Sequence, residues 1–217
     1  MKRIHALATS LLLAAGVAQA ATVHGEDFES GSKSAGWSGA GTVQSTGSFA
    51  SLGFGQQHLR VEGASAAVLT LNNLGAHSAI TLSFDLVLWD SIDGNPGGFP
   101  YGDLFQLRAD DVTLIEQLFG NYGTNGSQGP GSTLVQNDAD RGYGFWVDSA
   151  RRVQLTFAHT ADTVRFEFQY PNSQGSSDES FGLDNLQVSI TPVPEPGSWA
   201  LLLGGLGLVG LASRRRG

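Results

Sequence analysis

The sequence predicts an all-β protein: an antiparallel two-sheet sandwich of the jelly-roll or lectin-like kind over residues 21–190. Three observations support this fold class. Apolar and polar residues alternate with a period of two along several segments, turn residues separate those segments, and no segment between the two ends of the chain carries a convincing amphipathic helix. Two packed antiparallel layers require this pattern, because each strand buries one face and exposes the other.

The clearest alternation runs from Ile80 to Trp89, and it places Trp89 on the polar face of its strand. Shorter segments with the same period predict further strands at residues 59–61, 68–71, 104–107, 153–157 and 164–170. The segment Asp111–Asn121 fits either a helix or a strand followed by a turn, and we favour the strand.

The N-terminus has the three parts of a secretory signal peptide. Lys2 and Arg3 precede an apolar run from Leu7 to Val17, and Ala18-Gln19-Ala20 forms an A-x-A cleavage site. We therefore expect residues 1–20 to be removed on export. The chain contains no cysteine, so the exported domain must be stable without disulfides.

The C-terminal segment, residues 191–217, differs from the rest of the chain. Its first part, up to Pro196, is interrupted by prolines. An apolar stretch then runs from Trp199 to Ala212, and arginines follow at positions 214–216. The stretch is shorter than the ~20 residues that usually cross a bilayer, although helix-end anchoring can narrow the gap. The arginines fit the positive-inside rule. We expect a single short transmembrane helix that anchors the protein in the inner membrane before processing.

The order of these features resembles the PEP-CTERM sorting signal of exported bacterial proteins. Its motif residues here are Pro194, Glu195, Pro196, Arg214, Arg215 and Arg216. The resemblance implies processing by an exosortase and delivery to the cell surface or extracellular matrix.

Two segments at the edges of the domain resemble the first and last strands of MAM-type and jelly-roll carbohydrate-binding modules. These segments are Glu26–Gly31 with Trp37, and Phe181–Val188. The resemblance implies that the two strands pair and that a structural Ca²⁺ sits between them. It would bring Glu26, Glu29 and Asp184 together as metal ligands, although ordinary turn polarity explains these residues equally well.

A second calcium candidate is the acidic loop that begins at Asp90. Asp90, Asp93, Asn95 and the nearby Asp103 supply the oxygen ligands that Ca²⁺ prefers, around a glycine turn. A solvated turn capped by aspartates accounts for the same residues. We expect Ca²⁺ as the one cofactor, at one of these two sites.

Exposed aromatic side chains stack on sugar rings, and Trp89, Tyr101 and Trp146 are the candidates for such a surface. Packing in the core is the alternative for each of them. We expect an exported, non-enzymatic surface or matrix protein. The alternative is a carbohydrate-binding module that recognises exopolysaccharide, and an extracellular hydrolase ranks third.

Composition and charge exclude other classes. The net charge is −8, and the stretch from Ala21 to Ser213 is more acidic still, because it keeps all 20 acidic residues and loses the arginines and lysine at both ends. Nucleic-acid binding needs a basic surface, so we expect no such partner. The histidines are scattered without metal-ligand spacing, no G-x-S-x-G motif is present, and no catalytic residue is proposed.

Overall fold

The computed structural model describes residues 19–92, 94, 103–121, 132–141, 147–171, 179–193 and 196–214, except for the side chains of 136–139 and 196–202. The chain divides into two compact units, of which one is Ala20–Val193 and the other contains the C-terminal helix. The predicted signal peptide and the residues Asp93, Asn95, Tyr101, Trp146, Pro194, Glu195, Arg215 and Arg216 lie outside the described residues, apart from Gln19 and Ala20.

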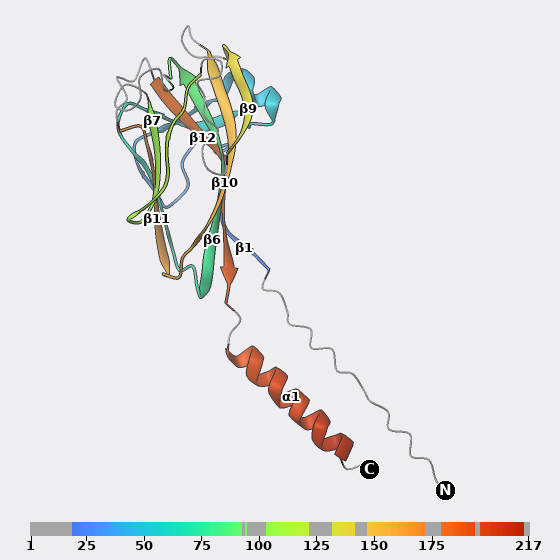
Figure 1. Ribbon diagram of the computed structural model, residues 1–217. Helices are drawn as coiled ribbons and strands as arrows, with labels where there is room; N and C mark the ends of the chain where they lie inside the picture. The colour runs from blue at the N-terminus through green and yellow to red at the C-terminus, as the bar shows by residue number, and fades with distance from the viewer. Residues whose placement is uncertain are drawn as a thin grey trace. The chain divides into compact units, whose positions relative to one another are not determined.

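Two antiparallel sheets face each other, as the alternation predicts (Figure 1). One sheet has the order β3-β4-β12-β6-β10-β9, with β1 also paired to β12, and the other has the order β2-β5-β11-β7-β8. The strands are β1 Ala21–Glu26, β2 Trp37–Gly39, β3 Thr42–Ser45, β4 Gln57–Glu62, β5 Ala67–Asn72, β6 His77–Asp90, β7 Leu104–Ala109, β8 Val112–Leu118, β9 Ser132–Ala139, β10 Asp148–Ala158, β11 Thr163–Gln169 and β12 Glu179–Pro192.

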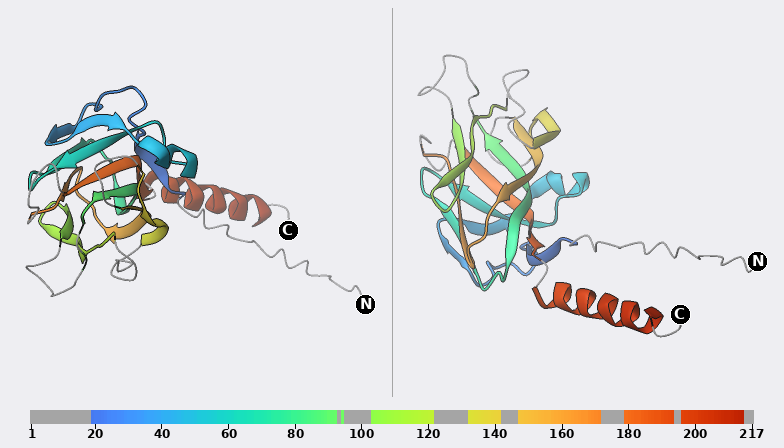
Figure 2. Two further views of the ribbon diagram at one scale, coloured as in Figure 1. Left: turned by 90° about the horizontal axis from the view of Figure 1, so that it is seen from above. Right: turned by 60° about the horizontal axis from the view of Figure 1, so that its bottom comes forward.

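The predicted strands are confirmed, and so is the choice of a strand for Asp111–Asn121, which contains β8. Their apolar faces meet between the sheets. Phe84 of β6, Phe105 of β7 and Phe168 of β11 are almost completely buried in this core. The views in Figure 2 show the same two layers from above and from below.

Trp89 corrects one prediction, because it does not present a free aromatic face. Its side chain is 0% exposed. It lies in a second, smaller core with Phe49, which belongs to the short 3₁₀ helix η1 (Gly47–Leu52), and with Phe54. The ring of Phe49 packs edge-on against Trp89 at 5.0 Å between centroids. Trp89 is therefore a structural residue and cannot stack on a sugar.

A buried histidine fixes the orientation of Trp89. The indole Nε1 donates to Nε2 of His58 at 3.1 Å, so the proton of His58 is on Nδ1, which contacts the Gln44 carbonyl at 3.1 Å. Burial lowers the pKa of His58 to about 4, and the ring is neutral at pH 7. Gly182 of β12 lies directly against this ring.

The helix α1 (Pro196–Arg214) occupies the predicted apolar stretch. The prediction of a transmembrane span is not confirmed: within the described ranges, no helix combines the length and apolar content needed to cross a membrane.

We predict that Gly182→Ala destabilises the sandwich. A Cβ at this position would lie 2.1 Å from Cδ2 of His58, whose ring is held by Trp89 and Gln44 and cannot move aside. Overpacking of this kind costs about 1–3 kcal/mol. Thermal unfolding measures the effect. Gly25→Ala is the matched control, because nothing lies within 4 Å of its Cβ position. Equal melting temperatures for the two variants would contradict the packing described here.

Candidate functional site

A β-bulge in β12 organises the candidate site. Ser180–Leu183 pair with β4, Leu186–Ile190 pair with β1, and the register against β6 shifts between Asp184 and Gln187. Asn185 has a φ of 47°, in the left-handed region that asparagine tolerates better than most residues. The bulge therefore marks the point where one edge of β12 changes its partner strand.

Two carboxylates fasten the loops that meet at this bulge. Asp184 is 0% exposed, and its Oδ2 accepts from the Gly55 backbone N–H at 2.9 Å, while its Oδ1 accepts from the Asn185 N–H at 2.7 Å. Glu29, just after β1, accepts from the Gln57 N–H at 3.0 Å, at the start of β4. The carboxylates thus satisfy backbone donors that the strand ladders leave free.

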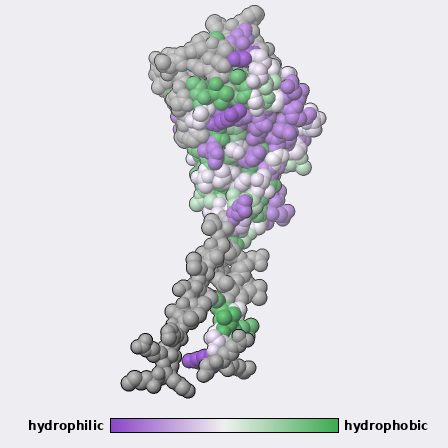
Figure 3. Space-filling model, turned by 90° about the vertical axis from the view of Figure 1, so that its right-hand side faces the viewer, coloured by the Kyte–Doolittle hydropathy of each residue, from purple (hydrophilic) through white to green (hydrophobic). Residues whose placement is uncertain are grey.

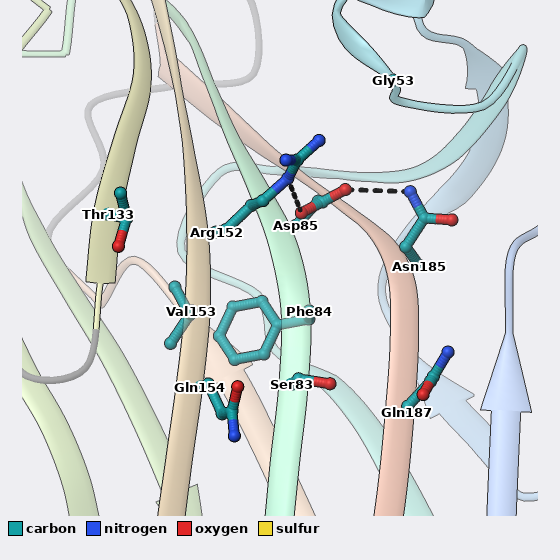
Figure 4. Close-up of a pocket in the computed structure, with 10 residues that line it drawn as sticks. All are labelled: Gly53, Ser83, Phe84, Asp85, Thr133, Arg152, Val153, Gln154, Asn185 and Gln187. Atoms are coloured by element: carbon teal, nitrogen blue, oxygen red, sulfur yellow. Dashed lines mark hydrogen bonds and ion pairs between the residues drawn. The ribbon is translucent and has the colours of Figure 1, made fainter.

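Asp85 of β6 lies on the outer face of the seven-stranded sheet, between the guanidinium of Arg152 and the side-chain amide of Asn185. Its Oδ1 is 3.4 Å from Nε of Arg152 on β10, and its Oδ2 accepts from Nδ2 of Asn185 at 2.8 Å (Figure 4). The Arg152 side chain is 54% exposed and the Asp85 side chain only 8%. Arg152 consequently keeps N–H donors that face solvent beside the buried carboxylate.

A depression of about 490 Å³ opens on this face of the seven-stranded sheet. Its lining comes from four neighbouring strands and one loop: Gly53, Ser83, Phe84, Asp85, Thr133, Arg152, Val153, Gln154, Asn185 and Gln187 (Figure 4). A second depression of about 270 Å³ lies toward β1 and shares Asn185 and Gln187 with the first. We call the two together the cross-strand groove. Hydrophilic residues cover much of the side of the sandwich shown in Figure 3.

Burial dominates the electrostatics of the groove. It raises the pKa of Asp184 to about 7, helped by the nearby charges of Asp85 and Glu29 and opposed by the two backbone hydrogen bonds. Burial also raises the pKa of Asp85, while Asn185 and Arg152 lower it. Two carboxyl groups of weakened acidity therefore lie beside each other, in directly opposed positions of β6 and β12.

The terminal strands pair as predicted, but the acidic residues there do not gather as calcium ligands. Glu26 turns to its own loop, where Oε1 accepts from the Phe28 N–H at 3.4 Å and Oε2 from the Ser34 N–H at 3.0 Å. Glu29 and Asp184 remain as a pair. Across the part of the chain that the structure describes, no three His, Asp or Glu side chains are arranged to hold a metal ion. Calcium at Glu26, Glu29 and Asp184 therefore stays a prediction.

The other calcium candidate is only half described. Asp90 and Asp103 are both buried, with exposures of 4% and 2%. Asp148 of β10 lies beside Asp90 and accepts from its backbone N–H at 2.9 Å, and burial raises the pKa of Asp148 to about 6. Asp93 and Asn95 fall outside the described residues, so calcium at this loop stays a prediction.

Sequence reasoning did not identify the residues that make the groove. Arg152, Asn185 and Gln187 have no local motif, and their neighbours are distant along the chain. The one available signal is Asp85, the single charged residue between Ile80 and Trp89. Of the predicted aromatic candidates, Trp89 is buried away from the groove, and Tyr101 and Trp146 are outside the described residues.

We predict that Asp184→Asn changes how stability depends on pH. The folded pKa of about 7 lies above the unfolded value of 3.8, so the neutral carboxyl stabilises the fold below about pH 4, and this stabilisation is lost as the pH rises through 7. Removing the charge should make the variant more stable relative to the wild type at pH 8 than at pH 5, by up to about 2.6 kcal/mol.

Urea unfolding at both pH values measures the difference between variant and wild type. Asp148 and His58 titrate in both proteins, so their contributions cancel in that difference, whereas Asp85, whose charge helps to raise the pKa of Asp184, is part of the measured effect. Asp111→Asn, at an exposed turn residue, is the control and should give no such change. A pH-independent difference for Asp184→Asn would contradict the assigned environment.

Solved structures with a similar fold are only distantly related. The carbohydrate-binding module TmCBM61, solved with beta-1,4-galactotriose, is 10% identical with a TM-score of 0.40, over 75% of this chain and 93% of that one. The K3 cleaved adhesin domain of Lys-gingipain from Porphyromonas gingivalis is 15% identical with a TM-score of 0.38, over 79% and 99%. The Agl-KA catalytic domain is 14% identical with a TM-score of 0.38, and the match spans 79% of this chain but 28% of that one.

The sequence comparisons concern the tail. No curated protein sequence matches the chain. Residues 192–216 match the PEP-CTERM protein-sorting motif, and this range contains all six predicted motif residues, from Pro194 to Arg216. The chain therefore carries a PEP-CTERM sorting motif, which implies an exported protein directed to the cell surface.

Proposed function

We propose that this protein is a non-catalytic component of the cell surface or extracellular matrix whose sandwich binds a polysaccharide in the cross-strand groove. The sorting motif at residues 192–216 supports the location. The observation that carries the proposed binding is that two polar depressions adjoin: Asn185 and Gln187 line both, and together the depressions extend from β9 to β1.

The chemistry of the lining favours a ligand rich in hydroxyl groups. Ser83, Gln154 and Gln187 offer both donors and acceptors, and Arg152 adds charged donors. Phe84 is the one aromatic residue among the lining residues, and with an exposure of 2% it belongs to the core. Binding would therefore depend on hydrogen bonds rather than on stacking against a ring.

The charge of the groove favours a neutral or amine-bearing polysaccharide over an acidic one. Asp85 pairs with Arg152, the one cation among the described lining residues, and Glu26 and Asp27 add negative charge at the β1 end. The sequence as a whole has a net charge of −8. An acidic chain would meet repulsion both at the groove and at long range.

The same contacts favour binding over catalysis. Asp184 is fully buried, and backbone N–H groups occupy both of its oxygens. Asp85 is held by Arg152 and Asn185 on its two oxygens. A general acid or base must reach the substrate, and these two carboxyl groups are turned toward the protein.

We predict that Gln187→Ala weakens polysaccharide binding by about tenfold, equivalent to about 1.4 kcal/mol. Gln187 is exposed and lines both depressions, so truncating it removes hydrogen bonds to the ligand while leaving the core intact. Affinity electrophoresis in gels containing a neutral β-glucan, chitosan or alginate measures binding to the neutral, amine-bearing and acidic classes.

Gln169→Ala, on β11 of the other sheet, is the control and should bind like the wild type. The proposal is supported if the β-glucan or chitosan gel retards the wild type and this retardation is lost in Gln187→Ala. The absence of retardation in all three gels, or equal loss in both variants, would refute it.

We predict that replacing Pro194-Glu195-Pro196 by alanines changes the location of the protein. These residues lie within the matched sorting motif, so the variant should leave the cell-surface or matrix fraction. Immunoblotting of cell fractions measures this. Replacing Gln56-Gln57 by alanines is the control, since it leaves the tail intact. An unchanged distribution of the tail variant would contradict a role of this motif in sorting.

A further inference from the structure

Two histidines and an aspartate form a hydrogen-bonded chain at the end of the sandwich where β12 finishes. His77 Nδ1 is 2.7 Å from the Gly75 carbonyl oxygen, His77 Nε2 is 2.8 Å from His159 Nδ1, and His159 Nε2 is 3.2 Å from Asp110 Oδ2. The two rings stack at 5.1 Å between centroids with an interplanar angle of 14°. No local sequence pattern predicts this chain, because its members come from β6, the β7–β8 turn and the segment after β10.

Counting protons determines the charge of the pair. The Gly75 carbonyl and the Asp110 carboxylate are acceptors, so each end of the chain requires an N–H from a ring. The central contact joins two ring nitrogens, of which one must be a donor and the other an acceptor. All three hydrogen bonds can form together only when three of the four ring nitrogens carry a proton. The closed chain therefore holds one positive charge, shared by the two rings.

The neighbouring charges suit this arrangement. Asp110 faces His159 directly, and its other oxygen accepts from the Arg165 N–H at 2.9 Å. Asp162 lies in the adjacent turn, where it accepts from the Gly75 N–H at 3.0 Å. The guanidinium of Arg165 is engaged by Glu167. The last residues of β12, from Ser189 to Pro192, carry no titratable side chain.

This chain lies where the sorting tail begins. Pro192 is opposite His77 in the register of β12 and β6, and the Val193 N–H donates to the Ala76 carbonyl at 3.1 Å. The match to the sorting motif starts at residue 192. His77 is 2% exposed, and the backbone at His77 pairs with this end of β12.

We propose that the His77–His159 pair is an acid-sensitive clasp that holds the root of the sorting tail, residues 191–193. With three ring protons the clasp is closed. A fourth proton turns both central nitrogens into donors, which breaks the bond between the rings and places two positive charges in stacked rings. Acid thus releases the end of β12, where the match to the sorting motif begins. The sandwich around the cross-strand groove stays folded.

Hydrogen exchange of the full chain, followed by mass spectrometry between pH 8 and pH 5 and corrected for intrinsic rates, tests the clasp. As the pH is lowered from 8 to 5, we expect the protection of the Val193 amide to rise to a maximum and then to fall at least tenfold. His159→Asn should abolish this fall, because its amide still donates to His77 but takes up no proton. His24→Asn, a histidine on β1 outside the chain, should behave like the wild type.

Nitrogen-15 spectra of the wild-type imidazoles give a second, independent readout. At the pH of greatest protection, three of the four ring nitrogens of His77 and His159 should be protonated. Two protonated nitrogens at that pH, or an unchanged acid response in His159→Asn, would overturn the proposal. Neither readout depends on polysaccharide binding, so failure here is distinct from failure of the proposed function.

Discussion

The divided edge of β12 is the constraint on which the rest of the structure depends. One edge of this strand pairs with β6 from Glu179 to Pro192. Its other edge pairs with β4 from Ser180 to Leu183 and with β1 from Leu186 to Ile190. Two strands cannot dock on one edge without a gap between them, and the bulge between Asp184 and Gln187 lies at that gap. The positions of Asp184, of Asn185 and of the loops before β4 and after β1 all follow from this one change of partner.

Buried charge is a direct consequence of the gap. Backbone N–H groups at Gly55 and Asn185 need acceptors, and a carboxylate satisfies both at once. The acceptor is itself desolvated, which is why the pKa of Asp184 rises to about 7 despite these bonds. Asp184 thus ties the segment before β4 to β12, and Glu29 ties the loop after β1 to the start of β4. The burial of Asp184 makes the stability of this region depend on pH.

Local pattern predicts the strands well, because a period of two is a property of consecutive residues. It predicts the groove poorly, because Asp85, Arg152 and Asn185 meet only through the pairing of β6 with β10 and β12. Trp89 was misjudged for a related reason: its face of β6 is the outer one, as the alternation indicates, but η1 covers it with Phe49. The Glu26 carboxylate accepts from the backbone N–H groups of Phe28 and Ser34, and its role as a calcium ligand stays a prediction.

The groove and the histidine chain lie on the same strand pair, yet the register separates them. Asn185 bridges toward Asp85 at the bulge, whereas His77 lies opposite Pro192, beyond an unbroken run of pairs from Gln187–Ser83 to Ile190–Ile80. Val188 and Ile190 of β12 are buried in the core along this run, so the ladder there is anchored on one face by packing as well as by hydrogen bonds. Loosening of the final residues of β12 would therefore stop at this anchored run, because propagating further requires exposing apolar side chains. One strand can thus carry a rigid binding surface and a releasable tail root at the same time.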